Sequence, residues 1–521
     1  MHISIILSVS DVTDWEYRLV KGIAALSTVK SVTIILVKIR PSFSSLIERG
    51  RFLAELAIGR TGFIKKNKDG MRGSGLSTVE IEPSKLSKML REINTDRVLL
   101  LVPETLVSLD ENEFEIIQLW WDGIQPYGLG ATRACDTPPH CLNITLRGYH
   151  DQYKTVVEHS ELSPMIGAFA AERRNAIARS FSLIFRALAH ESSTGPFNGL
   201  TKSRPARRFQ TILSILIAAE AIVCDLFYAL ARPLSRIIWR KDSWYIAYRT
   251  NQQCFVAVNA TSSPEGFLPY RSDYESFIAD PICFSLAGFD CVFFEEFPYD
   301  TQRGVISCAV LQQDGTLSKP RRVLERPYHL SYPFIFRDNG IVYMIPETAA
   351  NKTVELYRCT SFPNNWVFEK TLLSNIKATD ATLYNDGERW WMFVTVGEDG
   401  AYTWDELHLF MSDSSTGPWA PHPDNPVKCD ARSARPAGPL FRRDGRLIRP
   451  TQDCSVTYGG AINLCEIETL TPLSFRESVV DRIPASWFPG SDGLHTLSAS
   501  DRLEVIDIRP KYRFRWTTAT R

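Results

Sequence analysis

The sequence lacks the signatures of several common kinds of site. Its 11 cysteines form no Cys-x-x-Cys pair and their number is odd, which argues against a disulfide framework and a structural zinc centre. Lys and Arg together number 59, as do Asp and Glu, so no net charge attracts nucleic acid. Neither a Gly-x-Gly-x-x-Gly motif nor a Walker motif follows the first predicted strand, which leaves a dinucleotide or P-loop site without support. We therefore expect no metal ion, no cofactor and no nucleic-acid partner.

An uninterrupted apolar run of membrane-spanning length is also missing. The most apolar segment, residues 209–231, is broken by Glu220 and Asp225, whereas a span needs roughly 20 apolar residues. We expect a buried or interfacial helix there, and its basic flanks leave peripheral membrane contact open. The N-terminus shows no basic n-region and no small-residue cleavage site, so the expected location is the cytoplasm, with docking at the inner face of the membrane as an alternative.

What the second half does contain is a repeat, in which an apolar strand ends at a turn and resumes as an aromatic strand. The copies cover residues 280–295, 332–347, 381–394, 438–449 and, in degenerate form, 495–507. The turn glycines Gly288, Gly340, Gly387 and Gly445 are separated by 52, 47 and 58 residues, a period typical of a propeller blade of about four strands. Five such units predict a closed five-bladed β-propeller, with the strand at 244–249 paired to the strand at 503–508.

Equivalent positions of these copies carry polar residues. The innermost strand of each propeller blade lines the central channel, so equivalent residues converge on one axis. The side chains expected to converge are Asp280, His329, Tyr332, Asp380, Arg435 and His495. The repeat therefore predicts a polar site in the channel.

The first half has a different pattern, in which strands alternate with helices. Strands are predicted at 2–9, 31–39 and 96–102, with helical periodicity at 15–26 and 42–57. Continuous apolar strands between amphipathic helices indicate a parallel sheet covered on both faces. The expected fold is thus α/β plus all-β, with a Rossmann-like domain at 1–190, a linker and apolar helix at 191–240, and the propeller at 241–521.

The order of elements in the first domain resembles that of formyltransferases, with a Gly-rich turn at 128–130 and a strand at 141–146. That family carries an Asn and a His beside a Ser-Leu-Leu-Pro run. This chain has Asn143-Ile-Thr-Leu-Arg-Gly-Tyr-His150 without that run. The resemblance therefore implies a formyltransferase-like domain that has lost its activity.

Short motifs in the second half occur in a recognisable order. They include Ala279-Asp-Pro281, His329-Leu-Ser-Tyr-Pro333, Tyr343-Met-Ile-Pro-Glu347, Ala434-Arg-Pro-Ala-Gly438, Arg449-Pro-Thr-Gln-Asp453 and Gly493-Leu-His-Thr496. Over residues 240–510 the chain resembles the propeller in the N-terminal region of plant glucosamine inositolphosphorylceramide transferases and their bacterial relatives. That propeller is in turn similar to five-bladed family 43 glycoside hydrolases.

The second likeness implies roles for particular carboxylates. Family 43 hydrolases use an Asp base, an Asp that orients and tunes, and a Glu acid; Asp280 and Asp380 match the first two positions. Arg435 stands where the hydrolases carry Glu. Arginine cannot donate a proton near neutral pH, but it can bind a phosphate or carboxylate with two parallel hydrogen bonds. Glu347 is the alternative acid, as are Glu295 and Glu296.

The repeat and the resemblance together predict two groups of site residues, and the second half has no Asp-x-Asp metal motif. The catalytic group is Asp280, Asp380 and Glu347. The substrate-binding group is Arg435, His329, Tyr332, Glu296, Asp453 and His495. Structural alternatives stay open, because the two Asp residues also suit turn caps, Arg435 also suits an ion pair with Asp430 or Asp453, and both His residues also suit structural hydrogen bonds.

The function that the sequence favours is glycosyl transfer in the biosynthesis of a cell-surface polysaccharide or glycolipid. Its partners would be a sugar donor, activated by a nucleotide or a lipid phosphate, and a glycan or lipid acceptor. Two alternatives stay open: a family 43-type glycoside hydrolase using Asp280, Asp380 and Glu347, and a non-catalytic glycan-binding platform.

Overall fold

In the computed structural model, the chain divides into two compact units. The first comprises Met1–Ile238 with Asp399–Ala401, and the second comprises Trp239–Glu398 with Tyr402–Arg521. The structure describes residues 244–511 apart from 251–257, 273–274 and 398–401, and, before residue 244, mainly the strands of a seven-stranded sheet and the helix Leu86–Glu92.

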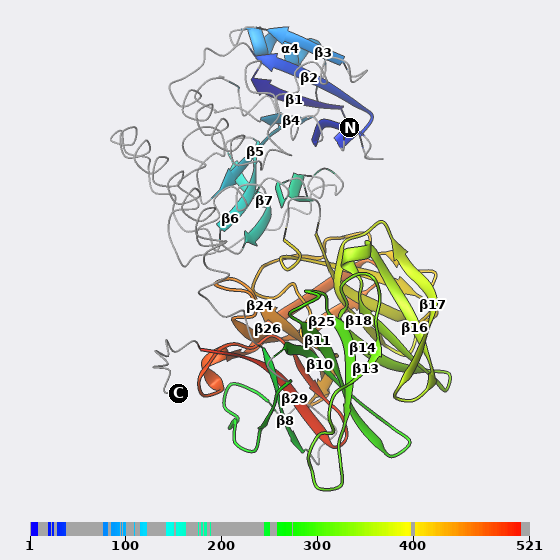
Figure 1. Ribbon diagram of the computed structural model, residues 1–521. Coiled ribbons are helices and arrows are strands. Elements are labelled where there is room, and N and C mark those ends of the chain that lie inside the picture. Colours follow the sequence, from blue (N-terminus) through cyan, green and yellow to red (C-terminus); the bar gives the residue numbers. More distant parts are fainter. Residues whose placement is uncertain are drawn as a thin grey trace. The chain divides into compact units, whose positions relative to one another are not determined.

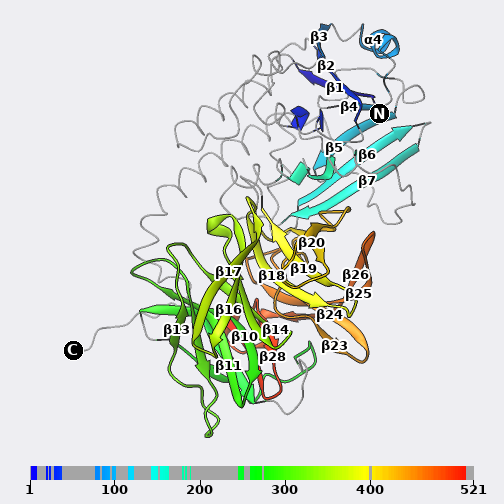
Figure 2. The same ribbon diagram turned by 90° about the vertical axis from the view of Figure 1, so that its right-hand side faces the viewer.

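The first unit contains a seven-stranded sheet of order β3-β2-β1-β4-β5-β6-β7. Its elements are β1 (His2–Ser8), β2 (Ser31–Val37), β3 (Ser77–Ile81), α4 (Leu86–Glu92), β4 (Arg97–Leu100), β5 (Glu115–Trp121), β6 (Leu142–His150) and β7 (Tyr153–Leu162). Strands β1 to β5 pair in parallel, whereas β6 and β7 are antiparallel and form the hairpin seen in Figure 2.

Part of the predicted first domain lies outside the described residues. The strands predicted at 2–9, 31–39 and 96–102 coincide with β1, β2 and β4. The helices predicted at 15–26 and 42–57 fall mainly or wholly outside the description, so the Rossmann-like and formyltransferase-like designations stay predictions. The apolar segment 209–231 is also outside it, and among the described residues no helix is both long and apolar enough to cross a membrane.

The second unit is the predicted five-bladed propeller. Blade one is β10 (Ser276–Leu286), β11 (Phe289–Pro298), β12 (Val305–Val310) and β13 (Arg321–Leu324). Blade two is β14 (Ser331–Asp338), β15 (Ile341–Glu347), β16 (Thr353–Ser361) and β17 (Asn365–Ser374). Blade three is β18 (Ala378–Asn385), β19 (Trp390–Val396), β20 (Glu406–Ser412), β21 (Ala420–Pro421) and β22 (Lys428–Cys429). Blade four is β23 (Phe441–Arg443), β24 (Arg446–Asp453), β25 (Ala461–Thr471) and β26 (Ser474–Pro484).

Blade five is assembled from both ends of the propeller sequence. Its strands are β27 (Ser491–Gly493), β28 (Leu497–Ala499), β29 (Leu503–Pro510), β8 (Tyr245–Thr250) and β9 (Leu268–Tyr270). β29 and β8 are antiparallel, with Leu503 opposite Thr250 and Ile508 opposite Tyr245. In Figure 1 the red strand β29 accordingly lies beside the green strand β8. The predicted closure of the ring is confirmed.

Apolar side chains join each blade to the next. Strand residues alternate between two faces, so Phe334 and Phe336 of β14 pack toward blade three while Ile335 packs toward blade one. Further apolar clusters join blades three and four, four and five, and five and one. Because every interface has its own core, the ring fixes the positions of residues at its centre.

Candidate active site

The inner strands of the first three blades contain the same irregularity. In each, two residues stand opposite one on the neighbouring strand: Asp280 and Pro281 in β10, Tyr332 and Pro333 in β14, and Asp380 and Ala381 in β18. The first residue of each pair has a positive φ, 54° at Asp280, 41° at Tyr332 and 55° at Asp380. This conformation costs a non-glycine residue about 1–2 kcal/mol. Recurrence of a strained bulge at one position in three blades is typical of a feature that directs a side chain into a site.

Two glutamates occupy equivalent places beside these bulges. Glu295 on β11 lies opposite Ala279, and Glu347 on β15 lies opposite Ser331. Each partner directly precedes a bulge residue, so the two carboxyl groups come from matching points of blades one and two. Burial, followed by the charge of Asp280, raises the pKa of Glu295 well above its ordinary value. Burial, followed by the charge of Asp380, does the same for Glu347, against the opposing charge of Arg435.

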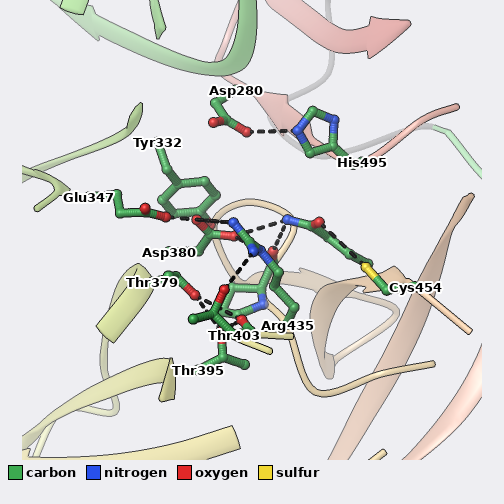
Figure 3. A network of polar contacts seen from close by, with 12 residues as sticks. Asp280, Tyr332, Glu347, Thr379, Asp380, Thr395, Thr403, Arg435, Cys454 and His495 are labelled. Atoms are coloured by element: carbon green, nitrogen blue, oxygen red, sulfur yellow. Dashed lines mark hydrogen bonds and ion pairs between the residues drawn. The ribbon is translucent and has the colours of Figure 1, made fainter. Parts of the chain in front are cut away.

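Arg435 holds the blade-three carboxylate with two hydrogen bonds. Its Nε donates to Asp380 Oδ2 at 2.5 Å and its Nη2 donates to Asp380 Oδ1 at 3.2 Å. The Gln452 side chain also donates to Asp380 Oδ2, at 2.9 Å. Glu347 Oε2 lies 3.5 Å from Arg435 Nη2, so one guanidinium lies between the carboxyl groups of two blades (Figure 3).

The partners of Arg435 differ from those expected from the sequence, and its substrate-binding role stays a prediction. The residue is 6% exposed, and its third nitrogen, Nη1, donates to Thr403 Oγ1 at 3.4 Å. The guanidinium therefore clamps carboxyl groups of the protein itself rather than presenting a free fork to a phosphate. Its ion-pair partners are also Asp380 and Glu347, not the neighbouring Asp430 or Asp453 that the structural alternative proposed.

His495 holds Asp280. His495 Nε2 lies 3.1 Å from Asp280 Oδ1, and His495 Nδ1 lies 2.7 Å from Asp507 Oδ2. The Thr496 hydroxyl adds a hydrogen bond of 3.1 Å to Asp280 Oδ1. Burial alone would lower the pKa of His495, but Asp507 and Asp280 raise it to about 10. Burial disfavours the Asp280 carboxylate, yet the hydrogen bond and charge of His495 outweigh burial and lower the pKa of Asp280.

The cluster therefore shifts the pKa values of its carboxyl groups in opposite directions. The contact with His495 favours the ionised form of Asp280, whereas burial favours the neutral form of Glu347 and Glu295. Environments that push two titratable groups apart define an acid and a base. Burial also raises the pKa of Asp380, and Arg435 opposes that rise.

The remaining predicted residues divide between the cluster and other parts of the blades. Tyr332 is fully buried, and its hydroxyl bonds Thr382 at 2.8 Å. His329 Nε2 lies 3.4 Å from Glu295 Oε1, and His329 Nδ1 accepts a hydrogen bond from the Gly304 amide. Burial lowers the pKa of His329, so a neutral imidazole borders the cluster.

Glu296 and Asp453 are not brought to the cluster. Strand alternation turns Glu296 away from Glu295, and its carboxylate bonds Ser307 and Arg322. The Asp453 carboxylate bonds Ser455 and Arg482 within blade four. Both carboxylates have partners of their own within a blade, and their substrate-binding roles stay predictions.

Three residues of the cluster were missed or passed over by the sequence predictions. Glu295 could have been preferred to Glu296, because the first two copies of the repeat end at Glu295 and Glu347. Gln452 lies inside the Arg449–Asp453 motif, next to the aspartate that was chosen instead. Asp507 ends the degenerate fifth copy, where no local signal marks it as different from a surface aspartate.

The fold and the cluster define a five-bladed propeller that brings together Asp280, whose pKa is lowered, and Glu347, whose pKa is raised. Residues 268–486 match the family model described as glucosamine inositolphosphorylceramide transferase 1, N-terminal. This range includes Asp280, Glu347 and Arg435, whereas His495 lies beyond it. The resemblance to that transferase region predicted from the motifs is thereby confirmed.

Curated plant proteins show the same relationship. The chain is 37% identical over 218 residues to glucosamine inositolphosphorylceramide transferase 1 of Oryza sativa subsp. japonica, covering 41% of this chain and 29% of that protein. It is 32% identical over 250 residues to the Arabidopsis thaliana protein of the same name, covering 47% and 31%. The chain thus spans less than a third of the length of these relatives.

Solved structures of glycoside hydrolases are more distantly similar. A thermostable family-43 glycoside hydrolase is 12% identical, with a TM-score of 0.34, over 47% of this chain and 92% of that chain. A family 117 glycoside hydrolase from Zobellia galactanivorans is 11% identical, with a TM-score of 0.34, over 52% and 93%.

Proposed function

We propose that the propeller transfers a sugar from a donor to a glycan or lipid acceptor, with Asp280 as the general base and Glu347 as the general acid. The observation that carries this proposal is a buried cluster in which His495, 3.1 Å from Asp280, lowers the pKa of that carboxyl group while burial raises the pKa of Glu347. Chemistry at a glycosidic bond needs such a pair, one group to take a proton and one to give a proton. The transferase names of the plant relatives support the choice of transfer.

In the proposed step, Asp280 takes the proton of an acceptor hydroxyl. The acceptor oxygen forms a bond to the anomeric carbon of the donor sugar, and the bond from that carbon to the leaving oxygen breaks. The electron pair stays on the leaving oxygen, which takes the proton of Glu347. The newly formed Glu347 carboxylate then has the Arg435 guanidinium nearby, at 3.5 Å in the present arrangement, and proton exchange with solvent restores both groups.

The proposal also includes the source of the donor and of the acceptor. Assembly of a cell-surface polysaccharide or glycolipid on the cytoplasmic side of a membrane would provide the donor and the acceptor. A phosphate-activated donor finds no free arginine fork in the cluster, since Arg435 binds Asp380. Because Arg435 is bound to Asp380, hydrolysis is the second candidate function. In hydrolysis, water takes the place of the acceptor hydroxyl.

A substrate panel tests the proposal and separates the two candidates. The full chain is incubated with nucleotide sugars, lipid-phosphate sugars and aryl glycosides, with and without glycan or lipid acceptors, and products are followed by mass spectrometry. Transfer requires an acceptor-dependent product, whereas hydrolysis yields free sugar without one. No product and no ligand-dependent rise in Tm across the panel would contradict both.

The same panel examines the role of Glu347. Glu347→Gln is expected to lower the rate about 10²–10⁴-fold for donors whose leaving oxygen needs a proton. Donors with an acidic leaving group should be affected far less, because they leave as anions. Glu355→Gln is a matched control in the same blade, since Glu355 bonds Tyr328 and Tyr357. Equal losses for every leaving group would contradict the acid role.

A further inference from the structure

The strand that closes the ring contributes a buried carboxylate to the cluster. Asp507 lies on β29, opposite Ile246 of β8, and it is fully buried. A buried carboxylate needs several donors to offset the loss of water. The partners that Asp507 uses come from two blades, so its position depends on the closed ring.

The Asp507 carboxylate receives hydrogen bonds on both oxygens. Oδ1 accepts the backbone N–H groups of His495 and Thr496, each at 2.9 Å. Oδ2 accepts the backbone N–H of Asp280 at 3.2 Å and lies 2.7 Å from His495 Nδ1. One side chain thus bonds the backbone of the strained bulge of blade one and contacts the imidazole that lies against the Asp280 carboxylate.

We propose that Asp507 is the positioning residue of the base, holding Asp280 and His495 in place so that closure of the ring completes the site. This inference rests on the proposed function for its catalytic meaning, although the positioning itself is open to direct measurement. Asp507 lies beyond residues 268–486, the range of the family match. The matched region therefore includes the base Asp280 but not Asp507, the residue that positions it.

The groups that face His495 set its charge. Asp280 and Asp507 contact its two ring nitrogens, and the charge of His495 also opposes the rise in the pKa of Glu295. Trp244 and Tyr458 pack against the ring, with centroids 4.1 and 5.4 Å away. Arg435 acts on Asp280 from the opposite side. Asp507 contacts both the imidazole and the backbone N–H of Asp280 in the bulge.

The first test follows the His495 ring by nitrogen NMR on the ¹⁵N-histidine-labelled full chain, with His495→Gln identifying the signal. In the wild type, both ring nitrogens are expected to stay protonated well above pH 8, because the pKa is raised to about 10. In Asp507→Asn, the ring should lose its proton at a pH lower by at least one unit. A wild-type ring that titrates at the ordinary value near 6.5 would overturn the proposal without any variant.

The second test is the pH dependence of kcat/KM for a substrate found in the panel. Asp507→Asn should move the acidic limb upward by at least one unit, a tenfold loss on that limb, with recovery at higher pH. His495→Gln should move the same limb of the pH profile in the same direction. This variant keeps the contacts of Asp507 with the backbone. Asp492→Asn, which removes the partially exposed partner of Arg509 in the same blade, is the control.

The outcomes of the two tests separate the positioning from the activity. An equal loss at every pH, with an unchanged His495 signal, would show a merely structural role for Asp507 and overturn the inference. If no substrate is turned over, the proposed function fails, and the NMR titration still decides whether Asp507 holds His495.

Discussion

Asp280→Asn is expected to lower turnover about 10²–10⁴-fold while leaving KM nearly unchanged. Asparagine keeps the size of the side chain and its place in the β10 bulge, but it cannot take the proton of the acceptor. The measurement is steady-state kinetics on the substrate found in the panel. Asp290→Asn is the matched control, because Asp290 is a buried aspartate of the same blade that bonds Ser285 and Arg502.

The pH dependence of activity should reflect the pKa shifts of both carboxyl groups. The base must be ionised, so activity falls as pH drops through the lowered pKa of Asp280. The acid must be protonated, so activity falls as pH rises through the raised pKa of Glu347. The two shifts widen the plateau in both directions. A rate in Asp280→Asn within a few-fold of wild type at all pH values would contradict the assignment of the base.

Arg435→Met is expected to lower the free energy of unfolding of the propeller by about 3–5 kcal/mol, because it leaves the Asp380 carboxylate buried without its cation. Asp380 is fully buried and receives both hydrogen bonds of the fork. The measurement is urea unfolding followed by tryptophan fluorescence. The double variant Asp380→Leu with Arg435→Met should recover most of the loss, since no unpaired charge then remains.

An additive result would contradict this account of the fork. If the double variant were as unstable as the sum of the two single changes, Arg435 and Asp380 would not act as a pair. A single Arg435→Met change that left the unfolding midpoint unaltered would mean that the guanidinium is free to bind a ligand, as the sequence alone had suggested.

The fold of the second unit was predictable because each blade repeats one local pattern. Gly288, Gly340, Gly387 and Gly445 have φ between 80° and 100°, the left-handed region that glycine enters without cost, and they mark the first turn of four blades. Ring closure was predictable for a similar reason, since strands at 244–249 and 503–508 were the two left without a partner. The first unit was less open to prediction, because its strands lack a repeat.

The site was only partly predictable, because strand order does not fix which face a side chain takes. Glu295 and Glu296 are adjacent in the sequence, and only the pairing of Glu295 with Ala279 places one rather than the other at the cluster. The partner of Arg435 was also hidden, since Asp380 lies 55 residues away. The spacing of the repeat predicted that the charged residues lie near one axis. The pairing of strands and of side chains in the fold then determines which of these residues can contact a substrate.

The division of carboxyl groups into an ionised base and a neutral acid is tested most directly by infrared difference spectroscopy of the full chain at pH 7. Subtracting the Glu347→Gln spectrum from the wild-type spectrum should leave the carbonyl stretch of a protonated carboxyl group, because burial and Asp380 raise the pKa of Glu347. Subtracting the Asp280→Asn spectrum should leave only the two stretches of an ionised carboxylate. Carboxylate bands from Glu347, or a protonated carboxyl band from Asp280, would contradict the account.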